Sequence, residues 1–345
     1  MRILFVHAAA DMSIGDVSRG YRMALERQGH EILDYYMTKR IAYHESAIPK
    51  DLPLQSRKEI ISRMASETIF NEAIYHNADF VLVVSGLSVH PVFLWLLRRL
   101  DIPTAVIFTE SPYDDLAQAQ WASLENVGER ANITIFTNDE YSAEHHGWHF
   151  LPPSYDPNIH RPEEPNKETK CDVFMCGSGW VERTKFLEAV DWTGIHLKLY
   201  GIWPMIKDNY DSPLYESFVP LIINNQKIAG MYAAVKISLN FHRAHEQALT
   251  PNPRIFEAAA CGVFQLSDPR KGLWNIFGES IPTFKTPAEL EQQVRYFLER
   301  PEQRQLLAAE ARRRVEVHTF DTRAVELIRV MEPVVAGRTL QVATV

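Results

Sequence analysis

Residues 250–268 read TPNPRIFEAAACGVFQLSD and place a helix start, a helix stop and a strand in immediate succession. Asn252 is a favourable N-cap residue, and Pro253 suits the first helical position, where its missing N–H costs nothing. The helix should run to about Cys261 and stop at Gly262, before a strand over residues 263–268. A helix that leads directly into an apolar strand is the repeating unit of a parallel α/β sheet.

The first turn of this helix has the features of an anion site. Its free backbone N–H groups and the positive end of the helix dipole suit a diphosphate. Arg254 adds a forked cation that matches phosphate oxygens. Glu257, three residues later on the same face, could accept hydrogen bonds from the two hydroxyls of a ribose. A well-capped helix with a surface Arg–Glu pair is the alternative interpretation.

The same alternation of strands and helices extends through both halves of the chain, so we expect an α/β protein. Two Rossmann-like, doubly wound domains should face each other across a cleft at the carboxyl ends of their strands. The predicted strands are residues 2–7, 79–86, 104–110 and 132–138, then 172–176, 196–201, 235–241, 263–268 and 281–284. The predicted helices include residues 17–28, 91–100, 253–261, 287–299, 302–317 and 321–331.

Residues 151–170, LPPSYDPNIHRPEEPNKETK, contain five prolines and no apolar periodicity, which is typical of an interdomain linker. The expected domains are therefore an N-terminal acceptor domain over residues 1–155 and a C-terminal donor domain over residues 170–320. A last helix within residues 321–335 could return to the first domain, followed by a frayed tail.

A second candidate segment is CGSGWVERTKFLEAV, residues 176–190. Gly177, Ser178 and Gly179 follow a strand and precede a helix, a setting in which backbone N–H groups approach phosphate. Arg183 and Lys185, one turn on, could neutralise phosphate charge. A plain tight turn explains the glycines equally well, because the third glycine of a dinucleotide fingerprint is absent.

A third segment, LNFHRAHEQ, follows a predicted buried strand at residues 239–247. Asn240, His242 and Arg243 should emerge where that strand opens into the cleft, and His242 is a candidate catalytic residue. His242 and His245 could suggest a metal, but no third ligand stands at a suitable spacing, so we expect no metal site.

The first half offers ESPYDD at a strand end, residues 110–115. Glu110 could act there as the base for an acceptor hydroxyl. Ordinary acidity of a surface loop is the alternative, and it is the stronger interpretation for Asp114 and Asp115.

Composition narrows the class of protein. No apolar run is long enough to span a membrane, and three cysteines without a CxxC pattern favour a reduced, cytoplasmic protein. The net charge is −8, and residues 1–150 hold 13 basic against 20 acidic residues, which argues against a DNA-binding surface. Residues 39–63 are a local exception, with six basic and three acidic residues, as expected for a solvated surface helix.

The order of these segments resembles the CgeB-like (spore-maturation-protein-like) glycosyltransferases, most closely over residues 170–330. The N-terminal half shares with them only SPYDD, FTND and LPPSYDP. The resemblance implies the GT-B fold and sugar transfer from a nucleotide sugar without a bound metal. It also brings Tyr200, Gly201 and Asn225, in the LYG and INN segments, into the predicted donor site.

Related retaining enzymes carry two paired glutamates, and the second one, which contacts the ribose, falls on Glu257. Glu246 does not match the first, because it lies eleven residues before Glu257 and the family spacing is eight.

The sequence thus predicts a metal-independent glycosyltransferase that moves a sugar from a nucleotide-diphosphate sugar, a UDP-sugar, to an acceptor hydroxyl. It needs no cofactor besides this donor substrate. Because no DxD triplet occurs, we expect Arg183, Lys185, Arg243 and Arg254 to balance the charge that grows on the leaving phosphates. A nucleotide-sugar epimerase or hydrolase and a non-catalytic sugar-nucleotide-binding protein remain alternatives. The acceptor could be a glycan, a protein, a small molecule or modified phage DNA.

Overall fold

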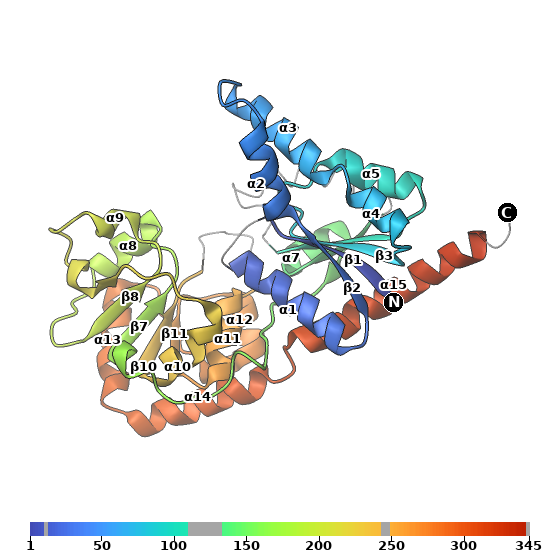
Figure 1. The fold of residues 1–345 in the computed structure, drawn as a ribbon. Coiled ribbons are helices and arrows are strands. Elements are labelled where there is room, and N and C mark those ends of the chain that lie inside the picture. Colours follow the sequence, from blue (N-terminus) through green and yellow to red (C-terminus); the bar gives the residue numbers. More distant parts are fainter. Residues whose placement is uncertain (10–12, 110–132, 243–248, 343–345) are drawn as a thin grey trace. The chain divides into compact units, whose positions relative to one another are not determined.

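The computed structural model describes residues 1–9, 13–109, 133–242 and 249–342 (Figure 1). For residue 13 and for residues 338–342 it describes the backbone alone. The chain divides into two compact units. Unit 1 consists of Met1–Pro152 and Phe320–Val345, and unit 2 of the described residues between Pro153 and Thr319. Each unit is built on one parallel sheet with its own hydrophobic core.

The sheet of unit 1 has six parallel strands in the order β2-β1-β3-β4-β5-β6. The strands are β1 (Arg2–His7), β2 (Glu31–Tyr36), β3 (Phe80–Val84), β4 (Thr104–Phe108), β5 (Thr134–Thr137) and β6 (His149–Phe150). β3 and β4 are buried along their whole length, as their unbroken apolar sequences require. Core side chains therefore cover both faces of this sheet.

The described helices of unit 1 are α1 (Ser13–Arg27), α2 (Met37–Ala47), α3 (Leu54–Ser66), α4 (Ile69–Tyr75), α5 (Pro91–Arg99), α7 (Glu140–His146) and α15 (Phe320–Val342). α15, at the end of the chain, packs on α1, near its beginning. Phe320 lies edge-on to Tyr21 at 5.2 Å, and Arg27 donates two hydrogen bonds of 2.8 Å to Asp321. Figure 1 shows α2 and α3 leaving the sheet as a pair.

The sheet of unit 2 has five parallel strands in the order β11-β10-β7-β8-β9. The strands are β7 (Cys171–Cys176), β8 (Leu197–Tyr200), β9 (Phe218–Val219), β10 (Val235–Asn240) and β11 (Gln265–Ser267). The helices are α8 (Val181–Glu188), α9 (Pro204–Lys207), α10 (Ile228–Ala233), α11 (Pro253–Cys261), α12 (Lys271–Phe277), α13 (Pro287–Leu298) and α14 (Pro301–Val315). Short 3₁₀ turns are η1 (Lys167–Thr169), η2 (Tyr215–Ser217), η3 (Asn225–Lys227) and η4 (Gly278–Ser280).

The proline-rich segment 151–170, predicted as an interdomain linker, contains the boundary between the two units, and its residues after Pro152 belong to unit 2. Tyr155, Asp156 and His160 are buried in unit 2. The backbone N–H of Tyr155 donates to the carbonyl of His318, at 3.1 Å. Long-range packing therefore fixes this segment, and the prolines shape an ordered path across the unit.

Three further details differ from the sequence prediction. Residues 281–284 form no strand, because only Thr283 bridges to Ser267. The edge strand β2 was not predicted, since Asp34 and Tyr36 interrupt its apolar pattern. The last helix continues to Val342, beyond the expected end at Met331 and through Pro333. Within the described part of the chain, no helix is long and apolar enough to cross a bilayer.

Candidate functional site

The candidate site lies at the carboxyl edge of the unit 2 sheet. Parallel strands end at one edge, and ligands of open α/β sheets bind there. The loops that follow β7, β8, β10 and β11 therefore come together, and those after β7, β8 and β10 carry residues singled out by the sequence. These four strands belong to the sheet of unit 2.

Glycines let the loops after β7 and β8 approach each other closely. Gly201 has a φ of +112°, and a Cβ there would lie 2.3 Å from the carbonyl oxygen of Gly177. A Cβ on Gly179 would lie 2.2 Å from the Trp203 ring. The backbone N–H groups of both glycines are bonded within the protein, that of Gly177 to the carbonyl of Tyr200 and that of Gly179 to the carbonyl of Ile202, at 3.0 and 2.8 Å. A phosphate contact of the segment Gly177–Gly179 stays a prediction.

Arg183 ties two of the loops together from the first turn of α8. Its guanidinium donates to the carbonyl oxygen of Ser178, after β7, and to that of Phe241, after β10, the latter at 2.8 Å. The guanidinium also lies 5.7 Å from the centre of the Phe241 ring. Arg183 is thus a fixed cation at the edge of the sheet, whereas Lys185 is exposed on the same helix.

His242, after β10, pairs with Asp268, after β11. The Asp268 carboxylate accepts from Nδ1 of the ring at 2.6 Å and from the backbone N–H of His242 at 2.8 Å. The His242 side chain is only 3% exposed. Asn240, the last residue of β10, donates to Ser267 at 3.2 Å and holds the two strand ends together.

The electrostatics of this pair favour a neutral ring beside a carboxylate. Burial lowers the pKa of His242 below its ordinary value, although Asp268 opposes that shift. Burial alone would raise the pKa of Asp268, but the hydrogen bond and charge of His242 hold it below the usual range. With Nδ1–H donated to Asp268, Nε2 carries the lone pair. Nε2 is buried and has no hydrogen-bond partner among the described residues, so it can accept a proton or a hydrogen bond.

The start of α11 adds a second group of polar side chains. Asn252 occupies the N-cap position, but its side chain makes no capping hydrogen bond. Its amide donates instead to the carbonyl of Phe241, at 3.2 Å, and so links α11 to the loop of His242. Pro253 stands at the first helical position, as the sequence predicted. Seven of the nine helix residues, Ile255–Cys261, are buried, and all of them except Glu257 have apolar side chains.

Glu257 is the centre of this second group. Arg254 approaches its carboxylate to 2.7 Å, and Asn225 donates to it at 3.2 Å. Arg254 also donates to the side-chain oxygen of Asn225, at 3.1 Å, so the three side chains form a closed set. Burial alone would raise the pKa of Glu257, but the charges of Arg254 and His160 and the hydrogen bond from Asn225 hold it below its usual range.

His160, from the segment 151–170, completes the surroundings of Glu257. Its Nε2 lies 3.9 Å from the carboxylate and has no hydrogen-bond partner among the described residues. The backbone N–H of Asp156 donates to Nδ1 at 3.2 Å, so in the neutral ring the proton is on Nε2, toward Glu257. Sequence reasoning missed His160 because its segment was interpreted as a linker.

Not every predicted residue presents its side chain at this edge. The Tyr200 ring packs in the core against Phe174, with ring centres 5.5 Å apart, and only its backbone carbonyl faces the loops. Glu110 and Arg243 lie outside the described residues.

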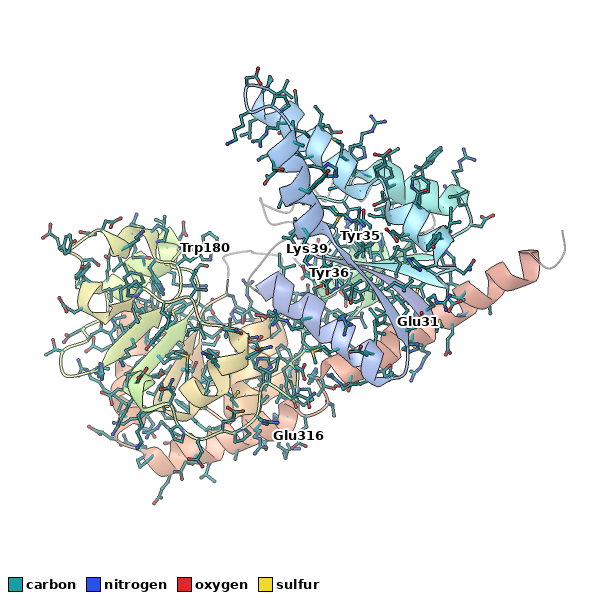
Figure 2. All side chains as sticks on the ribbon, viewed as in Figure 1. Glu31, Tyr35, Tyr36, Lys39, Trp180 and Glu316 are labelled. Atoms are coloured by element: carbon teal, nitrogen blue, oxygen red, sulfur yellow. The ribbon has the colours of Figure 1, made fainter. Side chains whose placement is uncertain are left out.

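The β7–β9 side of the edge is apolar, which the sequence reasoning also missed. Exposed large side chains follow each of these strands: Trp180, Ile202, Leu221 and Ile222. Backbone hydrogen bonds join their loops in that order, from Gly179 to Ile202 and from Gly201 to Leu221. Figure 2 labels Trp180 at the start of α8. The edge thus divides into an apolar part and a charged part, the latter formed by Arg183, His242 and Asp268.

Comparison with known proteins indicates the class of protein to which this site belongs. Residues 183–329 match the family model described as glycosyl transferase-like. This segment begins at Arg183 and contains every described residue of the charged part. The chain carries a glycosyltransferase domain. The expectation of a glycosyltransferase is confirmed at this level.

Solved structures of similar fold cover nearly the whole chain. Sucrose-phosphate synthase from Thermosynechococcus elongatus has a TM-score of 0.70 at 14% identity, with 97% of this chain and 99% of that chain covered. An alpha-glucosyltransferase solved with UDP-glucose and DNA has a TM-score of 0.62 at 12% identity, with 92% and 95% covered.

A putative UDP-N-acetylglucosamine 2-epimerase from Listeria monocytogenes also has a TM-score of 0.62, at 11% identity, with 96% and 95% covered. These likenesses confirm the predicted α/β fold of the GT-B type. No curated protein matches the chain in sequence.

Proposed function

We propose that this protein transfers a sugar from a UDP-sugar, held by unit 2, to the hydroxyl group of an acceptor. The observation that carries the proposal is the closed set of Asn225, Arg254 and Glu257 at the first turn of α11, inside the glycosyl transferase-like segment. A cation, a carboxylate and the positive end of a helix dipole within one turn suit a nucleoside diphosphate, whose phosphates are anionic and whose ribose carries hydroxyl donors.

The phosphates are assigned to the positive side of this set. Arg254 and the positive end of the α11 dipole supply charge, and Arg183 adds a second guanidinium on the neighbouring loops. Transfer leaves negative charge on the nucleoside diphosphate, so cations that are already in place lower the barrier. The transfer we propose therefore needs no divalent metal ion, and Lys185 and Arg243 remain candidates for additional charge.

The nucleoside is assigned to Glu257 and to the apolar part of the edge. The Glu257 carboxylate, with a lowered pKa, is an acceptor for ribose hydroxyls. It is 7% exposed, so ribose would approach it where Arg254 now covers it. Ile202, Leu221 and Ile222 provide an exposed apolar surface for the flat base. Uracil is supported by the similar fold of an alpha-glucosyltransferase solved with UDP, at 12% identity.

His242 is the candidate catalytic group of unit 2. Its neutral ring, oriented by Asp268, can accept a hydrogen bond from the transferred sugar or a proton during transfer. Glu110 stays a proposal for the acceptor base in unit 1. We also propose that the enzyme belongs to the CgeB-like group and acts in the cytoplasm, on the motif order and cysteine usage of the sequence.

The donor assignment is tested by UDP titration of matched variants. Arg254→Ala and Glu257→Ala should each weaken UDP binding by about ten- to a hundredfold, since a lost charged hydrogen bond is worth roughly 1.5–3 kcal/mol. Arg313→Ala is the control, because Arg313 forms an ion pair with Glu310 at the same three-residue separation, 2.7 Å long, on α14. Glu257→Gln keeps the volume of the buried side chain, so it tests the loss of the negative charge alone. Unchanged UDP affinity in the folded Arg254 and Glu257 variants would exclude this site.

A nucleotide-sugar epimerase or hydrolase is the second candidate, favoured by the fold shared with a putative UDP-N-acetylglucosamine 2-epimerase. Such an enzyme needs no acceptor. If incubation with UDP-sugars and no acceptor produces an epimer or free sugar at the full rate, transfer is not the reaction. Binding of UDP-sugar without turnover, with or without acceptors, would indicate the third possibility, a non-catalytic binding protein.

A further inference from the structure

Unit 1 contains a cavity that the proposed donor site does not use. It has a volume of about 510 Å³, within the usual range of roughly 300–1,000 Å³ for small-molecule sites. It opens at the carboxyl end of β2, between the first turns of α2 and the end of α3. Its lining includes Tyr36, Lys39, Tyr43, His44 and Glu67. Figure 2 labels Tyr36 and Lys39, where α2 leaves the sheet.

The side chains of one wall of the cavity are held in place by other residues of the chain. Asp34 accepts from Arg22 through both carboxylate oxygens, at 3.1 Å each, and from His7 at 2.8 Å. Arg40 donates to Thr68 at 2.7 Å and lies over the Tyr35 ring at 4.0 Å. The Tyr36 ring stacks on His7 with a centre-to-centre distance of 4.4 Å. These side chains hold the shape of the cavity without offering free groups.

Three other lining residues have polar side-chain groups that form no hydrogen bond or ion pair among the described residues. Lys39 lies 4.5 Å over the Tyr36 ring and forms no ion pair among the described residues. Glu67 is exposed, and its carboxylate likewise has no partner there. His44 has a buried Nδ1 without a hydrogen-bond partner in the described structure, next to Tyr43, whose ring is 70% exposed. The cavity therefore offers the ammonium donor of Lys39, the carboxylate acceptor of Glu67 and the open aromatic face of Tyr43, whereas the ring nitrogen of His44 is buried.

We infer that this cavity binds an uncharged carbohydrate, and that this carbohydrate is the acceptor of the proposed transfer. Two cations, Lys39 and Arg40, face two carboxylates, Asp34 and Glu67, so the lining has no excess charge to hold an anion. Four charged side chains make it equally unsuitable for an apolar compound. Hydroxyl groups both donate and accept, so they match Lys39 and Glu67 together, while the apolar face of a pyranose ring covers Tyr43.

The inference rests on the proposed function, because only a transferase needs this second substrate. The balance of charge also separates it from a DNA acceptor, whose phosphates would require a basic surface. Two of the six basic residues between 39 and 63 line the cavity, and the other four lie on α3 or in the turn before it.

The experiment is saturation-transfer NMR on the full chain, with glucose, N-acetylglucosamine, glucuronic acid and glucose 6-phosphate as probes. We expect transfer to at least one of the two uncharged sugars and not to the two anions. Tyr43→Ala and Glu67→Gln should weaken that binding by about three- to tenfold each, as expected for one contact or neutral hydrogen bond. Tyr75→Ala is the matched control, because Tyr75 is 80% exposed in unit 1 and does not line the cavity.

Thermal stabilisation by UDP is measured on the same samples and separates the two proposals. Absent UDP binding contradicts the proposed function. UDP binding without binding of either uncharged sugar overturns the inference alone. The inference is also overturned if the anionic sugars bind more tightly, if duplex DNA binds and Tyr43→Ala weakens it, or if neither cavity variant differs from Tyr75→Ala.

Discussion

Three side chains from three separate segments converge on one buried carboxylate at Glu257. Arg254 comes from the same helix, Asn225 from η3 and His160 from the segment before β7. A buried charge of this kind is stable only when partners compensate it, and removing one partner commonly costs about 3–5 kcal/mol. Bound ribose would replace part of that compensation. The coupling between nucleotide binding and stability should therefore be strongest at this residue.

The His242–Asp268 pair leads to a prediction about the pH dependence of activity. Burial lowers the pKa of His242, so the ring is neutral at pH 7 and protonates only as the pH falls below its ordinary pKa of about 6.5. If neutral Nε2 is the working group, kcat falls on the acid side as the ring gains a proton. Asp268 raises the His242 pKa, so Asp268→Asn should move this acid limb to lower pH.

His242→Ala should lower kcat by about 10²–10⁴ if the ring acts in general acid–base catalysis. The measurement is the pH profile of kcat for the wild type, Asp268→Asn and His242→Ala. An Asp268→Asn enzyme with reduced kcat but an unmoved acid limb would assign Asp268 a merely structural role.

In the loop between β7 and α8, the backbone of Gly179 lies so close to the Trp203 ring that only glycine fits there. Gly179→Ala would place a Cβ 2.2 Å from the Trp203 ring, which is buried and cannot easily move. Overpacking of this kind typically costs about 1–3 kcal/mol of folding stability. Gly337→Ala is the control, since a Cβ there meets nothing within 4 Å and helix propensity favours alanine.

Urea denaturation of the two alanine variants checks this prediction. Gly179→Ala should shift the midpoint of unit 2 downward and weaken UDP binding, because Arg183 is anchored to the carbonyl of Ser178 in the same loop. Equal midpoints for Gly179→Ala and Gly337→Ala would mean that the loop relaxes around the added methyl group.

The elements that the sequence predicted correctly are those whose signal is local. β3 and β4 are unbroken apolar runs, and α11 has proline at its start and glycine after its end. The edge strand β2 was missed because Asp34 and Tyr36 point away from the core and carry the cavity of unit 1. Its pairing with β1 depends on a partner elsewhere in the chain, which a local pattern does not contain.

The candidate site was predicted only in part, for the same reason. Arg254 and Glu257 are three residues apart on one helix, so their pairing follows from helix geometry. Asp268 lies 26 residues from His242 and reaches it only because β11 is the neighbour of β10 in the sheet. His160 reaches Glu257 through a segment whose composition indicated a linker. Side chains that meet through topology need the fold before they can be recognised.

For the molecule as a whole, the proposed chemistry requires no divalent metal. In the proposed donor site, the charge of the leaving phosphates is assigned to Arg183, Arg254 and the N-terminus of α11. We expect EDTA to leave the transfer rate within about twofold of the untreated enzyme, a change of roughly 0.4 kcal/mol in the barrier. The assay compares EDTA-treated enzyme with and without added Mg²⁺ or Mn²⁺. Activity that vanishes with EDTA and returns with either ion would contradict this phosphate site.

The path of the chain makes unit 1 depend on the last helix of the sequence. Leu327, Ile328 and Met331 of α15 are buried in the same core as Phe5 and Leu82 of the sheet. Burying large apolar side chains contributes about 1.5–3 kcal/mol each, so the three together supply roughly 5–9 kcal/mol. That is comparable to the whole stability of a typical domain, about 5–15 kcal/mol.

A chain that ends at Thr319 should therefore lose the fold of unit 1 while unit 2 keeps its own core and its UDP site. Calorimetry should show one unfolding transition fewer than for the full chain, and UDP should still raise the melting temperature of the remaining one. The triple variant L327A/I328A/M331A in the full chain tests the same contacts without changing chain length, and it should give the same pattern. If UDP binding disappears in both variants, the donor site is not confined to unit 2. If unit 1 still melts cooperatively in both, the packing of α15 contributes far less than its buried area indicates.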